Sequence, residues 1–105
     1  MNLSDYSDFE TVLSKAKYYY GENVILKKST RKTKKYMIYN PYNNKFIHFG
    51  QMGYKDFTKY IQIYDIKRAN EHRIRYLKRA LSIKGKWVYN PYSPNFLSIL
   101  LLWDF

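Results

Sequence analysis

The sequence predicts an α+β fold, in which a small antiparallel sheet packs with about three helices in a single domain, residues 1–105. Two runs rich in aromatic and β-branched residues, 36–39 and 45–49, flank turn residues and predict a β-hairpin within 36–49. Three other segments carry the apolar patterns of helices. A length of 105 residues, 46% of them apolar, is enough for one modest core.

The first helix is predicted to begin at a capping box and to end at a glycine. Ser7 and Glu10 have the spacing at which a hydroxyl caps the first turn and an acidic side chain reaches back to it. Apolar residues within 9–16 mark one helix face, and Gly21 suits the left-handed end of a helix. A short strand is expected next, at 24–26.

A strongly basic segment, KKSTRKTKK, follows at residues 27–35. It has no apolar side chain, so we expect a solvated loop or a mobile arm. Such segments supply sequence-independent affinity for nucleic acid by releasing counterions, although an inert linker has the same composition. The candidate contacts here are Lys27, Lys28, Arg31, Lys32, Lys34 and Lys35.

Turn residues separate the shorter elements. Gly50 and Gly53 interrupt the chain after the hairpin, and residues 56–62 are expected to form a turn or two of helix. The sequence Tyr-Asn-Pro-Tyr at 39–42 recurs at 89–92. We interpret this recurrence as two uses of one turn type, and not as a duplicated domain.

Residues 65–82 form the strongest predicted helix. Its apolar residues recur at near-helical spacing and are expected to face the core: Ile66, Ala69, Ile74, Leu77, Ala80 and Leu81. Residues 87–89 are expected to be extended. Ser93 and Pro94 then have the order of an N-cap and a first-turn proline for a buried helix over 96–103. Trp87 and Trp103 are both expected to be buried.

Basic side chains gather on one face of the 65–82 helix. The spacing i, i+4, i+7 and i+11 aligns Arg68, His72, Arg75 and Arg79, and Lys67 and Lys78 flank this stripe. Guanidinium groups bind phosphate with two parallel hydrogen bonds, so such a row can follow a sugar-phosphate backbone. The alternative is the ordinary solvated face that every amphipathic helix has.

The net charge of +11 is concentrated in the middle of the chain. Residues 24–86 contain 17 Lys and Arg residues against three acidic residues, as expected for a protein that contacts polyanions. An AT-rich genome would also raise the content of Lys, Asn, Ile and Tyr, but it would not favour arginines. Aromatic residues between the cations suit either the stacking of unpaired bases or core packing: Tyr18, Tyr19, Tyr20, Tyr36, Tyr39, Tyr42, Phe46 and Phe49.

No enzyme, metal site or cofactor is predicted. The chain has no cysteine, no glycine-rich phosphate loop, and two histidines, His48 and His72, without paired carboxylates. The hairpin resembles that of GIY-YIG nucleases in part, but residues 35–37 replace their first Gly-Ile-Tyr and no later acid is well placed. The acidic, polar start is not expected to act as a signal peptide, and the apolar run 96–103 is about half the length of a membrane span. No membrane contact is therefore expected.

An ordered series of motifs runs from residue 48 to residue 103. It reads His-Phe-Gly at 48–50, Tyr-x-Asp-Phe-Thr at 54–58, Arg-x-x-Tyr-Leu-x-Arg at 73–79, Gly-x-Trp at 85–87, Asn-Pro-Tyr-Ser at 90–93, Leu-Ser at 97–98 and Leu-Leu-Trp at 101–103. The series resembles a small family found in large nucleocytoplasmic DNA viruses and some phages. The resemblance implies a viral protein made in the host cytoplasm, and it implies no particular activity.

Two functions follow as expectations. The first is a non-enzymatic viral protein of the virion or viral factory that binds DNA or RNA through its phosphates, independently of sequence. The second is a minor capsid or cement protein that contacts viral capsid proteins. Composition and spacing leave both open.

Overall fold

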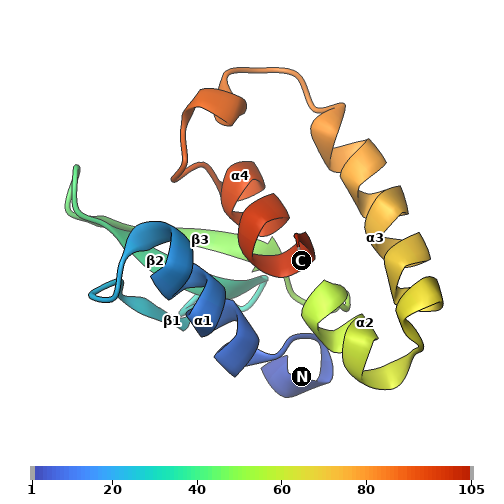
Figure 1. Cartoon of the computed structure of the whole chain (residues 1–105). Helices are drawn as coiled ribbons and strands as arrows, with labels where there is room; N and C mark the ends of the chain where they lie inside the picture. The colour runs from blue at the N-terminus through green and yellow to red at the C-terminus, as the bar shows by residue number, and fades with distance from the viewer. Residues whose placement is uncertain (1, 105) are drawn as a thin grey trace.

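The computed structural model describes residues 2–104 and has the predicted α+β architecture (Figure 1). One antiparallel sheet has the strand order β1-β2-β3, with β1 at Leu26–Lys28, β2 at Lys34–Asn40 and β3 at Lys45–Gln51. The α-helices are α1 (Phe9–Tyr20), α2 (Phe57–Ile63), α3 (Ile66–Leu81) and α4 (Pro94–Ser98). Two 3-10 turns, η1 (Leu3–Asp5) and η2 (Trp87–Tyr89), and a π-helical segment η3 (Ile99–Trp103) complete the fold.

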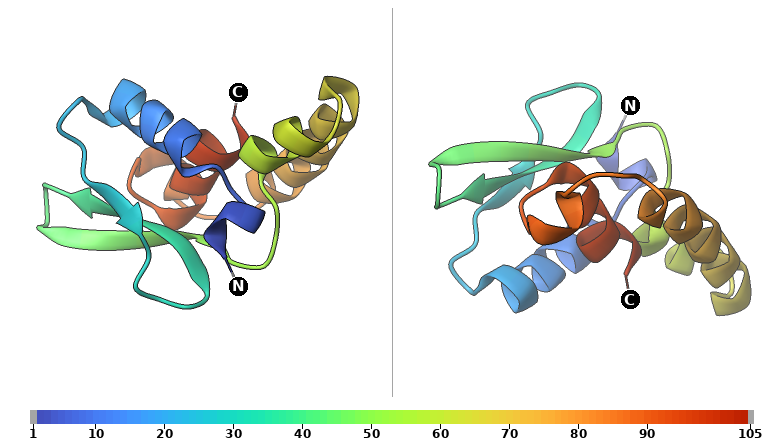
Figure 2. Two further views of the ribbon diagram at one scale, coloured as in Figure 1. Left: turned by 90° about the horizontal axis from the view of Figure 1, so that it is seen from below. Right: turned by 90° about the horizontal axis from the view of Figure 1, so that it is seen from above.

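The register of the predicted hairpin determines which side chains enter the core. Tyr36 pairs with Phe49 and Ile38 with Ile47, so all four side chains point to the same face of the sheet. Helices α1 and α4 both cover this face, whereas α3 projects away from the sheet (Figure 2). The core therefore lies between the sheet and these two helices, and α3 forms one side of the molecule.

Helix α1 has a different cap from the predicted one. Asp8 is the N-cap, and its carboxylate accepts a hydrogen bond from the Thr11 N–H at 3.2 Å. Ser7 is instead buried, where its hydroxyl accepts a hydrogen bond from the Tyr36 hydroxyl at 2.7 Å. The prediction of a Ser7 cap is wrong because the neighbouring carboxylate caps the same N–H groups and is also stabilised by the helix dipole.

The basic segment 27–35 is not a mobile arm. Its two ends belong to β1 and β2, and residues 29–33 form the turn between these strands. The Ser29 N–H donates to the Lys35 carbonyl at 3.0 Å, and the Lys34 N–H donates to the Arg31 carbonyl at 3.1 Å. The expected solvated loop is therefore limited to residues 29–33, which are mostly exposed. The prediction of an unpaired segment over 27–35 is wrong at both ends because strand pairing uses backbone groups, which a composition of polar side chains does not exclude.

Helix α3 has the predicted extent but a different rotation. Three aliphatic residues expected in the core are 45–62% exposed: Ile66, Ile74 and Leu81. The Tyr76 ring stacks on Trp103 with centroids 4.2 Å apart, and the Arg73 guanidinium donates to the Trp103 carbonyl at 2.9 Å. These two contacts, together with the burial of Ala69 and Ala80, determine which face of α3 packs inward.

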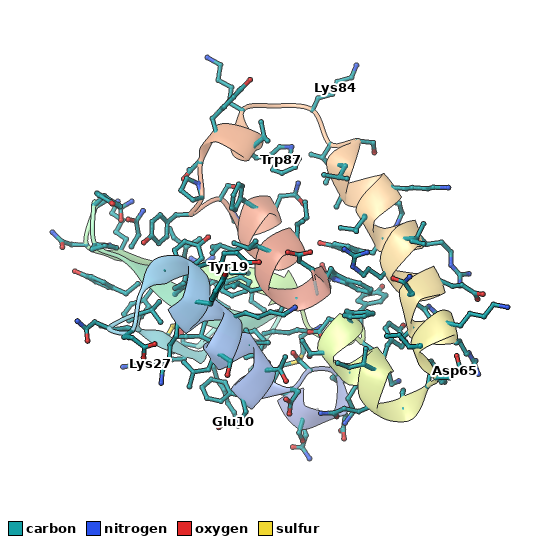
Figure 3. All side chains as sticks on the ribbon, in the orientation of Figure 1. Glu10, Tyr19, Lys27, Asp65, Lys84 and Trp87 are labelled. Atoms are coloured by element: carbon teal, nitrogen blue, oxygen red, sulfur yellow. The ribbon has the colours of Figure 1, made fainter. Side chains whose placement is uncertain are left out.

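The C-terminal helix begins as predicted. The Ser93 hydroxyl accepts a hydrogen bond from the Phe96 N–H at 3.2 Å, and Pro94 occupies the first turn. Trp103 is buried, as expected, but Trp87 is only half-buried. Trp87 lies in the turn η2 and not in an extended run (Figure 3). Its indole N–H donates to the Ile83 carbonyl at 2.7 Å.

The two Tyr-Asn-Pro-Tyr sequences make the same turn and meet in space. In each, the asparagine side-chain oxygen accepts a hydrogen bond at 3.0 Å from the backbone N–H two residues later, Asn40 from Tyr42 and Asn90 from Tyr92. The rings of Tyr42 and Tyr92 have centroids 6.0 Å apart. These contacts hold the hairpin tip against the connection between α3 and α4.

Candidate functional site

A basic cleft of about 750 Å³ lies where α3 and α4 meet the ends of β2 and β3. Its basic lining comes from three separate segments of the chain: Lys34, Lys35, Lys55, His72, Arg75 and Arg79. No Asp or Glu is among the described residues that line it. The cleft therefore has the charge and the size expected of a site for an anionic ligand.

A buried ion pair supports the floor of the cleft. The Lys35 ammonium lies 3.1 Å from the Asp56 carboxylate, and both side chains are almost completely buried. Burial lowers the pKa of Lys35, while Asp56 acts in the opposite direction by favouring the charged form. The other carboxylate oxygen of Asp56 accepts a hydrogen bond from the Thr58 hydroxyl at 2.5 Å. The prediction that Lys35 is a mobile contact is therefore wrong, because this side chain is structural.

Stacked rings hold the N-terminal half of α3 in place beside the cleft. The His72 ring lies parallel to the Tyr60 ring, with centroids 4.2 Å apart and 5° between the planes. Tyr64 stacks on His72 at 5.7 Å, and the Arg68 guanidinium lies over the Tyr64 ring at 3.9 Å. Desolvation and the nearby Arg75 and Arg68 lower the pKa of His72, which favours the neutral imidazole.

Tyrosine side chains add hydrogen-bonding and stacking groups to the cleft. Tyr60 and Tyr76 line it, and burial raises the pKa of both hydroxyls, which stay protonated and can donate. Tyr54 lines the opposite side next to Lys55, and its side chain is 69% exposed. An exposed ring beside a cation is a stacking surface for an unpaired base.

The structure divides the twelve predicted contacts into two groups. Five line the cleft: Lys34, Lys35, His72, Arg75 and Arg79. Seven do not: Lys27, Lys28, Arg31, Lys32, Lys67, Arg68 and Lys78. Lys27 lies on the sheet, on the other side of the molecule from Asp65 at the start of α3 (Figure 3), and its ammonium lies over the Phe46 ring at 5.8 Å. Lys67 and Lys78 are exposed on the opposite flank of α3.

Sequence reasoning missed Tyr54, Lys55 and Tyr60. They approach α3 only after the chain turns at Gly53, so their contribution depends on tertiary packing. The available signal was an adjacent tyrosine and lysine in a glycine-rich break. Of the aromatic residues considered for stacking, Tyr36 and Phe49 are buried core residues instead.

Within residues 2–104, no group of three or more His, Asp or Glu side chains is arranged to hold a metal ion. In the same part of the chain, no helix has the length and apolar character needed to span a membrane.

Comparison with known proteins identifies a family for this chain. No curated protein and no solved structure matches the chain. Residues 24–80, just over half of the chain, match the model of a family of unknown function, DUF5754. The matched segment contains the sheet from β1 to β3, α2 and nearly all of α3, and with them all six basic residues of the cleft. The protein belongs to the DUF5754 family.

Proposed function

We propose that the protein binds nucleic acid independently of base sequence, by holding backbone phosphates in the basic cleft. The observation that carries the proposal is the convergence of basic side chains from β2, the loop before α2, and α3 around a cavity whose lining, among residues 2–104, contains no Asp or Glu. The role is one of binding and not of catalysis.

The chemistry of the lining suits phosphate. Arg75 and Arg79 lie one turn apart on α3 and can each form two parallel hydrogen bonds to a phosphate. Lys34 and Lys55 line the other side of the cleft and add point charges. A chain of phosphates can therefore be held from both sides of the cleft, while Tyr54 offers a ring to an unpaired base. We expect single-stranded nucleic acid to bind more tightly than duplex.

Resemblance to a family of large DNA viruses and phages suggests where such binding would serve. On that basis we propose a protein of the virion or of the viral factory in the host cytoplasm. Recovery with the core nucleoprotein of purified virions would support the proposal, and its absence from both virions and factories would contradict it.

A cluster of tyrosines favours a second candidate, a minor capsid or cement protein. Tyr20, Tyr42 and Tyr92 form a continuous ring cluster, and Tyr42 is 86% exposed at the hairpin tip. Exposed aromatic residues are enriched in protein interfaces. Cross-linking to capsid subunits, with loss of the cross-link in Tyr42→Ser, would favour this function over the first.

Two matched double variants test nucleic-acid binding. Arg75→Gln with Arg79→Gln removes two cations from the cleft, whereas Arg31→Gln with Lys32→Gln removes two from the β1–β2 turn. The cleft pair should weaken binding about tenfold or more at ~0.1 M salt and reduce the salt slope by about two, for every sequence tested. The turn pair should have a much smaller effect.

Fluorescence anisotropy with labelled oligonucleotides at several salt concentrations measures the affinity and its dependence on salt. With four accessible lining cations, the parent should show a slope of about −3 to −4 in log affinity against log salt. Equal losses in both double variants, or a flat salt dependence, would contradict the proposal. Arg and Gln have similar helix propensity, so the melting temperature should stay within a degree or two.

A further inference from the structure

Helix α3 carries an exposed aliphatic stripe on the side away from the basic cleft. The stripe consists of Ile66, Ile74 and Leu81, with the half-buried Leu77 between the last two. Lys67, Glu71 and Lys78 border the stripe and separate it from Arg75 and Arg79. An exposed apolar row of this length on a highly charged protein marks a contact surface.

The spacing of the stripe is nearly the same in both directions along the helix. Ile74 comes eight residues after Ile66 and seven before Leu81. In a two-fold symmetric dimer, the same patch must be complementary to itself. Two antiparallel copies of α3 centred on Ile74 meet this condition, because Ile66 of one copy then lies opposite Leu81 of the other.

The charges at the border of the stripe also fit a second copy. In the antiparallel register centred on Ile74, Glu71 comes level with Lys78 of the other copy, within about one residue rise of 1.5 Å. The two-fold symmetry places a second pair of Glu71 and Lys78 at the equivalent position of the interface. Glu71 is the one acidic residue within α3, so the helix places its single negative charge where it meets a cation of the second copy.

An apolar groove beside the stripe provides a pocket for the end of the second helix. The groove has a volume of about 300 Å³ between α1, α2 and the start of α3, and its apolar lining is Phe57, Ile61 and Ile66. Ile66 belongs to both the groove and the stripe. Leu81 of the other copy, which lies opposite Ile66, is therefore positioned beside the groove.

We infer that the protein forms an antiparallel homodimer through α3, with Ile74 at the two-fold axis and the two basic clefts left open. The contact is independent of the proposed nucleic-acid binding. One helix of about 24 Å per copy buries less than the ~800 Å² per partner of a standard interface, so association is weak. Since each copy carries a charge of +11, the dimer becomes stronger as salt screens the repulsion.

Sedimentation velocity over a wide concentration range, without nucleic acid, tests the dimer. The parent should approach twice the monomer mass as concentration rises, and higher salt should favour the dimer. Ile74→Asp should weaken association by about tenfold or more, because it places two carboxylates together at the symmetric centre. Val88→Asp is the matched control, because Val88 is 51% exposed outside the stripe, and it should leave association unchanged.

A charge reversal tests the register. Glu71→Lys should weaken the dimer, and Glu71→Lys combined with Lys78→Glu should restore it. A parent that stays monomeric at all concentrations would overturn the inference, as would equal effects of Ile74→Asp and Val88→Asp or a failure of the double reversal to restore association. Because Ile74→Asp leaves the cleft intact, its affinity for an oligonucleotide per protomer should match that of the parent, which separates this result from a failure of the proposed function.

Discussion

The cleft and the β1–β2 turn are both rich in cations, but they differ in how those cations are held. In the turn, Arg31 and Lys32 are neighbours in the sequence, and both are exposed. In the cleft, Lys34, Lys55 and Arg75 come from distant segments and face a common space. A polyanion responds to the field of charges that converge around a cavity more than to a run of charges along the chain. The comparison therefore supports the cleft, and not the turn, as the proposed binding site for a polyanion.

The largest expected effect concerns the anchoring of the cleft floor. Asp56→Asn leaves the buried Lys35 without its counter-charge, so we expect a loss of about 3–5 kcal/mol in the free energy of unfolding, measured by urea denaturation. Asp65→Asn is the matched control, because Asp65 is an exposed N-cap and asparagine caps as well as aspartate. A similar small change in both variants would show that the floor does not depend on the ion pair.

A smaller effect compares two glycines near the cleft. Gly50 has φ +81°, and an added Cβ would lie 2.9 Å from Leu102 Cδ1, whereas Gly53 has φ +95° with no atom within 4 Å. Gly53→Ala should cost about 1–2 kcal/mol from backbone strain. Gly50→Ala should cost about 1–3 kcal/mol more, because the tightly packed side chains must also move. Thermal unfolding of both variants measures the difference, and equal costs would contradict the close packing of the floor.

The smallest effect is a pH dependence confined to the cleft. The lowered pKa of His72 keeps it neutral when the site is empty, and a bound phosphate favours the imidazolium, so binding takes up a proton. Affinity should therefore rise about two- to fivefold as pH falls from about 7.5 to 5.5. The stability of the unbound protein should change in the opposite direction. Because the pKa of His72 is lower in the folded state than in the unfolded state, protons bind the unfolded state more readily, and the free energy of unfolding decreases as the pH is lowered.

Anisotropy titrations of His72→Gln and His48→Gln distinguish the two histidines. His48 also has a lowered pKa, from desolvation and the nearby Arg31, but it lies outside the cleft. His72→Gln should remove the pH dependence of affinity, and His48→Gln should retain it. If His48→Gln removed the pH dependence of affinity instead, binding would be assigned to the β1–β2 turn.

Local patterns predicted the elements well and their packing only in part. The 65–82 helix and the hairpin have strong periodic and turn signals, and both are confirmed. The rotation of α3 depends on Trp103, about thirty residues away in the sequence from Arg73 and Tyr76, and no local pattern contains that information. For the same reason, the alignment of Arg75 with Arg79 was predictable, whereas the approach of Lys55 to them was not.

The short length of β1 has a consequence for the self-association of folded chains at high concentration. β1 is an edge strand of three residues, and edge strands expose backbone groups on which another sheet can add. Two of its three residues, Lys27 and Lys28, are exposed lysines, and a short, charged edge is a known protection against edge-to-edge aggregation. The charge of β1 therefore disfavours pairing at this edge of the sheet, even if these lysines never contact a phosphate.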